Sequence, residues 1–297
     1  MRILQRYLLL RRDTELLAEL DRLAIPYQLT ERTQAPSVVC QFYLYEDDPG
    51  FAEKTAALQP FALDPPWACI ELSPEDVESA EWFQLEVGQT GYPQPEDGWF
   101  ELAYGTEGTC GTCGHHGRQV APFRFAREPA ANRHFFGLNW AFEAIFARDE
   151  VLAAFQEEGI SGVGFSRPVL HRNGAPLRRL WQLEAQHTLG SALRTLNLAS
   201  ERCAPVTDDK ARRFLTAIGS RSVQGPFCGR VKYNHPRREL MTFDAAALAG
   251  APDVVITRDL FGSGGSANRV TLVSRRVRDV IRDRKLKGAT FRPVRLA

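Results

Sequence analysis

The spacing of apolar residues in the first third of the chain predicts strands and helices in turn. Residues 2–10 and 37–45 are apolar runs of strand length. Between them, Asp13 and Thr14 introduce a stripe at helical spacing, made by Leu16, Leu17, Leu20 and Leu23. Residues 73–76 have the features of a helix start, because a Ser cap and a Pro at the first position precede acidic residues.

Later stretches continue the alternation. Residues 99–104 resemble a strand, 139–158 a long helix and 208–218 a second helix. Residues 150–165 then recur as residues 276–291 at a constant offset of 126 positions. Five apolar or glycine positions of each copy correspond: Val151, Phe155, Ile160, Gly162 and Phe165 to Val277, Ile281, Leu286, Gly288 and Phe291. We expect each copy to form a short helix, a Gly-containing turn and a strand. Chance likeness between common units is the alternative to duplication.

These elements predict an α+β protein of two subdomains, each a mixed sheet with packed helices. We place an acidic N-terminal subdomain at residues 1–138 and a C-terminal subdomain at residues 139–297. A zinc-knuckle-like site would join the two.

Charge is distributed unevenly along the 297 residues, although the net charge is only +1. From Glu46 to Glu107 there are fifteen acidic residues and one lysine, whereas from Arg258 onward there are eleven basic and three acidic residues. Such asymmetry reflects either a solvated surface or a charged partner. The first residues do not follow the pattern of a signal peptide, and no apolar run is long enough to span a membrane. Six cysteines without such a signal predict reduced thiols and a cytoplasmic protein.

The strongest chemical signal is Cys110-Gly-Thr-Cys113-Gly114, which has the form of a zinc knuckle. The spacing brings two sulfurs to one ion, and the glycine permits a tight turn. Residues 225–229 have the form of a second such motif. Gly225 stands in place of its first cysteine, and Cys228 is its second cysteine. We therefore predict Cys110, Cys113 and Cys228 as zinc ligands. A fourth donor would come from His115, His116, Cys203 or water. The alternative is a vestigial knuckle without metal.

Signatures of the common enzyme classes are missing from the sequence. It contains no Gly-x-Ser-x-Gly elbow, no His-Glu-x-x-His pair and no phosphate-binding Gly-x-x-x-x-Gly-Lys motif. The basic segment 275–287 also carries Asp279 and Asp283, which oppose phosphate binding. We therefore expect neither catalysis nor nucleic-acid binding.

The two cysteine motifs, together with the C-terminal pattern from Ser274 through Gly288 to Pro293, resemble the double-CxxCG proteins expanded in myxobacteria. The resemblance covers Tyr104 to Ala297. That family includes immunity proteins that protect a cell from toxins delivered by its siblings. The resemblance implies a non-enzymatic protein that binds and neutralises a cognate toxin. A zinc-ribbon nucleic-acid-binding regulator and an enzyme with an unrecognised site are the alternatives.

A toxin that acts on nucleic acid presents a basic cleft, so the acidic region is the predicted contact surface. Negative charge and aromatic anchors would both come from this region. The residues that we expect to contact the partner are Glu75, Asp76, Glu78, Glu81, Trp82 and Trp99.

Overall fold

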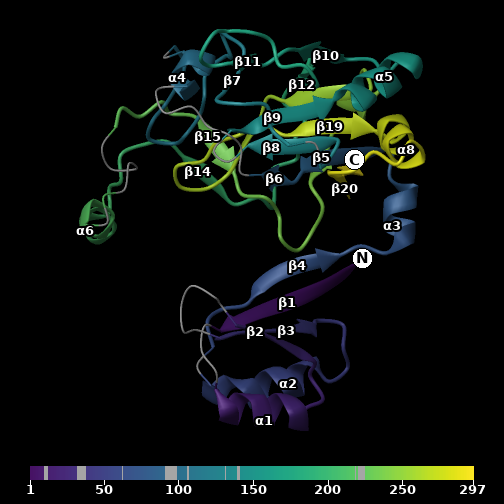
Figure 1. The fold of residues 1–297 in the computed structure, drawn as a ribbon. Coiled ribbons are helices and arrows are strands. Elements are labelled where there is room, and N and C mark those ends of the chain that lie inside the picture. Colours follow the sequence, from purple (N-terminus) through teal and green to yellow (C-terminus); the bar gives the residue numbers. More distant parts are fainter. Residues whose placement is uncertain are drawn as a thin grey trace. The chain divides into compact units, whose positions relative to one another are not determined.

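A computed structural model describes most of the chain: residues 1–9, 13–31, 38–61, 63–90, 99–105, 107–130, 132–138, 141–217, 219 and 225–297 (Figure 1). The chain divides into two compact units. The first unit contains Met1–Ser79 and Pro236–Leu240, and the second contains Ala80–His235 and Met241–Ala297. Both units combine helices with sheets, which confirms the α+β class. No helix in the described ranges has the length and apolar character needed to cross a membrane.

In its described residues the first unit has four strands and three α-helices, in the order β1, α1, β2, β3, α2, β4, α3. Their bounds are β1 Arg2–Leu9, α1 Thr14–Arg22, β2 Tyr27–Glu31, β3 Val38–Tyr45, α2 Phe51–Leu58, β4 Trp67–Glu71 and α3 Pro74–Ser79, with a 3₁₀ turn at Gln59–Phe61. The strands form one antiparallel sheet in the order β2-β3-β1-β4. This is the split βαβ, or ferredoxin-like, arrangement, with α1 and α2 on the same face of the sheet (Figure 1).

The apolar stripe predicted for the first helix forms the core of this unit. Leu16 and Leu20 of α1 are buried against Phe42, whose ring stacks on Tyr7 at 4.8 Å between centroids. The Asp13 carboxylate caps α1 by accepting a hydrogen bond from the Leu16 N–H at 3.1 Å.

The second unit carries the remaining elements. Its helices are α4 Trp99–Tyr104, α5 Asp149–Glu157, α6 Asp209–Ala217, α7 Ala245–Leu248 and α8 Arg275–Asp283. Its strands are β5 Trp82–Val87, β6 Gln89–Thr90, β7 Arg124–Phe125, β8 Phe135–Leu138, β9 Ala141–Arg148, β10 Val163–Ser166, β11 Val169–Leu170, β12 Leu180–Ala185, β13 Thr188–Leu189, β14 Ser200–Arg202, β15 Val231–Tyr233, β16 Thr242–Phe243, β17 Val254–Thr257, β18 Leu260–Phe261, β19 Thr271–Ser274, β20 Ala289–Pro293 and β21 Arg295–Leu296.

Two five-stranded sheets of the second unit repeat one design. The β9 sheet has the order β10-β12-β9-β8-β6, and the β19 sheet has the order β20-β5-β19-β17-β13. In each sheet the first three pairs are antiparallel and the last pair is parallel. The short strand that follows β5 joins the β9 sheet, and the short strand that follows β12 joins the β19 sheet. We call each of these two sheets, together with its helix α5 or α8, one half of the second unit. Each half thus receives its last strand from the chain segment that follows a strand of the other half.

The register of the sheets extends the equivalence to single residues. Gln182 of β12 lies opposite Phe146 and Ser166, and Gln84 of β5 lies opposite Leu272 and Arg292, each 126 positions later. Strands β12 and β5 consequently align as Trp-Gln-Leu-Glu with Phe-Gln-Leu-Glu. This second likeness supports duplication, because chance would have to produce the same order, direction and register twice.

Two glycines hold equivalent turns. Gly162 and Gly288 have φ of +76° and +102°, and a Cβ at either position would clash with a backbone oxygen, of Val254 or of Phe135. Val254 is the first residue of β17 and Phe135 the first residue of β8, and each of these strands is the fourth of its sheet. Glycine is required here by close approach as well as by conformation.

The predicted repeat is confirmed. Residues 150–165 and 276–291 each contain helix, turn and strand, and Val151, Phe155, Val277 and Ile281 are buried.

Three sequence expectations need correction. The helix predicted over 139–158 is helical only at its end, because β9 occupies Ala141–Arg148. That strand has buried residues on both faces, so its nearly continuous apolar sequence does not alternate visibly. The strand expected at 99–104 is helix α4. The expected boundary between residues 138 and 139 falls between the paired strands β8 and β9, inside the second unit.

Candidate metal centre

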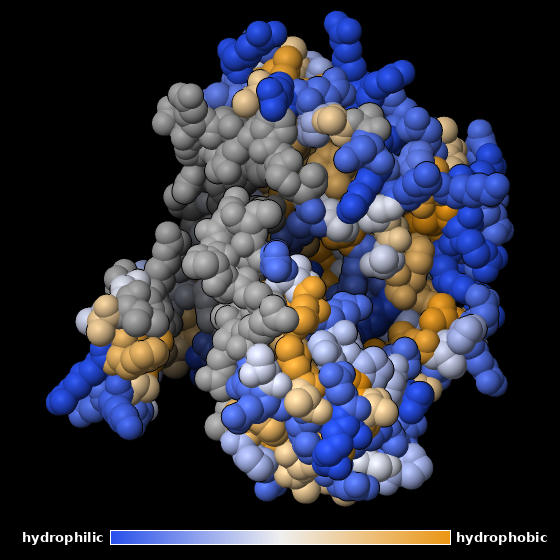
Figure 2. Space-filling model, turned by 60° about the horizontal axis from the view of Figure 1, so that its bottom comes forward, coloured by the Kyte–Doolittle hydropathy of each residue, from blue (hydrophilic) through white to orange (hydrophobic). Residues whose placement is uncertain are grey.

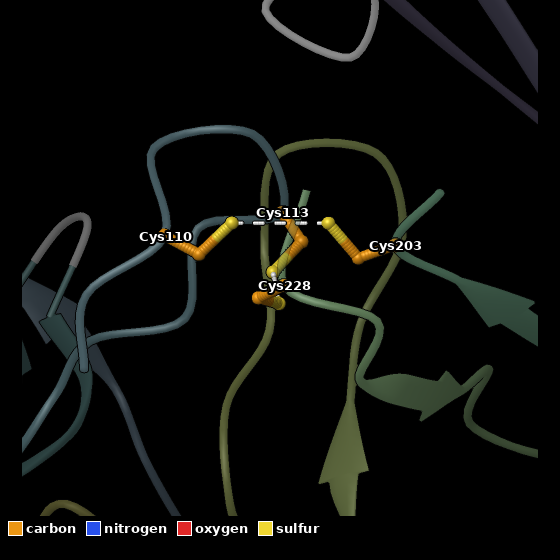
Figure 3. A group of neighbouring side chains, drawn as sticks. All are labelled: Cys110, Cys113, Cys203 and Cys228. Atoms are coloured by element: carbon orange, nitrogen blue, oxygen red, sulfur yellow. Dashed lines mark hydrogen bonds between the residues drawn. The ribbon is translucent and has the colours of Figure 1, made fainter. Parts of the chain in front are cut away.

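Four cysteines of the second unit point toward one another (Figure 3). The sulfur atoms of Cys110, Cys113, Cys203 and Cys228 all lie within 4.8 Å of each other. The sulfurs of Cys113 and Cys228 lie 3.6 Å apart, and those of Cys110 and Cys203 lie 3.7 Å apart. A tetrahedral ion with zinc–sulfur distances of about 2.3 Å requires sulfurs about 3.8 Å apart. The four thiols therefore have the number and spacing needed to hold a metal ion.

The first pair of thiols comes from a tight turn. The Cys110 N–H donates to the His115 carbonyl at 2.8 Å, and the Gly114 N–H donates to the Cys110 carbonyl at 2.9 Å. Gly114 has a φ of +73°, and a Cβ there would clash with the Gly265 carbonyl. Gly114 therefore allows both the left-handed backbone conformation of the turn and the close contact with the backbone at Gly265.

The second pair comes from two paired strands rather than from one turn. Cys203 follows β14 and Cys228 precedes β15, and these strands are antiparallel. The Cys203 N–H donates to the Arg230 carbonyl at 2.8 Å, and the Gly229 N–H donates to the Cys203 carbonyl at 3.0 Å. The segment between the two cysteines carries α6, on which hydrophobic and hydrophilic residues gather in separate patches (Figure 2).

Apolar neighbours and the thiols' own hydrogen bonds set the electrostatics of the cluster. Cys110, Cys113 and Cys203 are buried among Leu260 and Ala267. Burial raises the pKa of Cys113 and of Cys203. At Cys110 burial acts the same way, but hydrogen bonds from backbone N–H groups and neighbouring thiols outweigh it and lower the pKa to about 6. Thiolate charge is thus favoured at the first cysteine of the knuckle.

The structure brings the three predicted ligands together and adds Cys203 as the fourth. The His115 ring lies 3.1 Å from the Gly108 carbonyl, and the His116 ring packs on Tyr104 at 5.1 Å between centroids. Neither histidine belongs to the cluster found among the described residues. A count of cysteines favours Cys203, because Cys40 and Cys69 lie in strands of the first unit. No knuckle surrounds Cys203, so local sequence gave no further signal.

The predicted partner-binding residues are distributed over both units. Glu75 and Glu78 are exposed on α3 of the first unit, and Glu81 is exposed at the start of the second. Trp82 is only 7% exposed and packs in the apolar cluster around Phe243, so it is a core residue and offers almost no surface to a partner. Trp99 begins α4, and its side chain lies outside the described part of the structure.

Asp76 has a local structural role. Its carboxylate accepts hydrogen bonds from the N–H and hydroxyl of Ser73, both at 2.8 Å, and pairs with the Met1 amino group at 2.6 Å. The pKa of Asp76 is lowered to about 2, mainly by the Met1 amino group and next by the hydrogen bonds from Ser73. Reciprocal bonding with Ser73 is a capping box at the start of α3.

Comparison with known proteins adds no assignment. No protein-family model matches this chain, and no curated protein matches it in sequence.

Proposed function

We propose that this chain is a non-enzymatic immunity protein, with zinc bound by Cys110, Cys113, Cys203 and Cys228 as a structural ion. The observation that carries the proposal is the closed set of four thiols. Four cysteines leave a tetrahedral ion no open position for water or substrate, as in structural sites. Such an ion contributes folding free energy directly, and it would bind the turn at Cys110–Cys113 to the paired strands β14 and β15, since each of these two segments supplies two ligands.

The completed ligand set also strengthens the resemblance to the double-CxxCG proteins. Gly225 removes one ligand from the second motif, and Cys203 supplies a sulfur beside Cys228 from another strand. The role proposed for the chain is to bind and neutralise one cognate protein toxin in the cytoplasm. Charge in the first unit supports a basic toxin, such as one that acts on nucleic acid.

Native mass spectrometry of protein purified with zinc supplied tests the metal. We expect one zinc ion per chain, lost or bound at least 100-fold more weakly in Cys203→Ser. Cys69→Ser is the matched control, because Cys69 lies in β4 of the first unit. A wild-type chain without zinc under these conditions would refute the site.

Co-expression tests the immunity role. If a neighbouring gene encodes the cognate toxin, cells that produce this toxin should survive when the chain is present and die when it is absent. An inactivated toxin controls for burden, and a purified complex of the two proteins should accompany survival. Death of cells that contain folded, soluble chain would count against the role.

A further inference from the structure

The sheet of the first unit has a second face, opposite α1 and α2. On the helix face, Tyr7, Phe42 and Leu44 are buried. Strand pairing places alternate residues together on the other face, which we call the open face. It carries Leu4, Arg6 and Leu8 of β1, Gln41, Tyr43 and Tyr45 of β3, and Trp67 and Cys69 of β4.

Exposed aromatic and apolar side chains gather on the open face. Trp67 is 55% exposed, Tyr43 38% and Leu8 37%. Strand pairing sets Arg6 opposite both Tyr43 and Trp67, so these three residues form one row across the sheet. A contiguous exposed patch of this kind marks an interaction site more often than scattered apolar residues do.

Arginine side chains lie over two of the rings. The Arg237 guanidinium is 4.0 Å from the centroid of Trp67, and that of Arg2 is 3.9 Å from the centroid of Tyr45. Tryptophan, tyrosine and arginine are the residues that dominate binding energy at protein interfaces. The open face therefore has the composition of an interface core.

The unit as a whole is acidic, although the open face itself carries Arg2 and Arg6, and Arg237 lies over Trp67. Asp47 and Glu71 lie at one end of the face, and the unit has fifteen acidic residues against nine lysines and arginines. An aromatic sheet face with arginines could in principle stack single-stranded nucleic acid. The excess of carboxylates opposes phosphate and favours a cationic protein surface instead.

We propose that the open face is the docking surface for a basic protein partner, with Tyr43 and Trp67 as its anchors. The carboxylates of the unit steer the partner, and the aromatic row sets the lifetime of the complex. Identification of that partner as a toxin rests on the proposed function, whereas the chemistry of the surface does not. This assignment replaces Trp82 as the aromatic anchor.

Kinetic measurements with the inactivated toxin form the first test. Tyr43→Ala with Trp67→Ala should weaken binding at least tenfold, mainly through faster dissociation. Glu71→Gln with Glu75→Gln should slow association about threefold at low salt and have little effect at high salt. Phe214→Ala is the control, since that ring is 64% exposed on α6 of the second unit. If the wild-type chain and the Tyr43/Trp67 variant protect cells from the toxin equally well, the docking surface is overturned and the immunity role stays intact.

A second test does not depend on a toxin. The indole N–H resonance that is missing in Trp67→Phe identifies Trp67 in the full chain, and poly-L-arginine is the probe. We expect this resonance to shift, and the affinity to fall at least fivefold in Tyr43→Ala with Trp67→Ala but not in Phe214→Ala. No shift, or tighter binding to a 20-nucleotide oligothymidylate at the same residues, would overturn the proposal. Unchanged thermal unfolding of the variants shows that the fold is kept.

Discussion

Gln182 and Gln84 occupy the same place in two sheets of the same order, but their surroundings differ. Gln182 is 5% exposed and exchanges two hydrogen bonds with Gln119, at 2.9 and 2.6 Å. Gln84 is 8% exposed, and its side-chain oxygen has no hydrogen-bond partner in the described ranges. It lines a cavity of about 460 Å³ instead. In the β9 half the side chain of Gln119 lies beside the glutamine, whereas in the β19 half the equivalent glutamine faces a cavity.

The halves also differ in charge where they meet. Glu143 and Arg269 are equivalent positions, 126 apart, and form an ion pair at 2.6 Å. Glu158 and Arg284 are likewise equivalent and lie 2.9 Å apart. Equivalent residues touch only near a two-fold axis, so these pairs mark the approximate axis between the halves. Two identical chains would place like charges there, whereas a duplicated chain can place opposite ones.

The comparison separates what the framework needs from what each half can change. Backbone contacts are kept: the Gln186 N–H donates to the Gly162 carbonyl as the Gly88 N–H donates to that of Gly288. Side chains beside the framework differ in size, charge and partners. The two halves therefore share their turns and strand pairs and differ in the side chains beside them.

The largest effect should come from the shared turns. Gly162→Ala and Gly288→Ala force a Cβ into a left-handed residue and against a backbone oxygen, and each should cost about 2–4 kcal/mol of unfolding free energy. Similar losses in urea unfolding would support equivalence. Gly174→Ala is the control: its φ is +70° but nothing lies near a Cβ, so about 1 kcal/mol is expected. A full loss in one half and none in the other would break the comparison.

An intermediate effect is expected at the axis. Glu143→Gln leaves the charge of Arg269 unbalanced, and we expect a loss of about 1–3 kcal/mol, because Arg269 is one-third exposed. If the axis is genuine, exchanging the pair, Glu143→Arg with Arg269→Glu, should recover part of that loss. Unfolding of the single and double variants measures the coupling. An exchange that costs as much as the two single changes added together would show that the surroundings of the pair are not equivalent.

The smallest effect sharpens the difference between the glutamines. Gln119→Ala removes both hydrogen-bond partners of the buried Gln182 amide and should lower the free energy of unfolding by about 1–2 kcal/mol. Gln84→Leu removes an oxygen that has no partner among the described residues, so it should be nearly neutral. Calorimetric melting distinguishes the two variants. Equal losses would mean that the amide of Gln84 is satisfied, for instance by ordered water in the cavity.

The sequence reveals only part of this duplication. The copies at 150–165 and 276–291 are recognisable because helix, turn and strand are contiguous in both. Strand β5 comes before the other strands of its sheet in the chain, whereas β12 comes after β8, β9 and β10. The offset of 126 positions that relates the two copies therefore does not relate Phe83-Gln84 to Trp181-Gln182. The division after Ser79 is hidden for a similar reason, since Trp82 pairs with residues close to the other end of the chain.

The metal centre shows the same limit. Cys110 and Cys113 share one turn, so their spacing alone predicts a knuckle. Cys203 reaches Cys228 through the pairing of β14 with β15, which residue spacing does not encode. From the sequence, Cys203 is one of four candidates for the fourth ligand, and nothing in the sequence selects it over the others.

Strand β5 has a consequence for the order in which the protein can be built on the ribosome. The Thr290 hydroxyl donates to the Glu86 carbonyl, 204 positions earlier. At about 5–20 residues per second, β5 waits about 10–40 s for that neighbour to be synthesised. Until β19 has been synthesised, both edges of β5 are unpaired, and one edge stays unpaired until β20 follows; such exposed edges favour aggregation. Nascent chains stalled before β19 should therefore depend on chaperones, whereas the first unit, apart from Pro236–Leu240, can fold as it emerges.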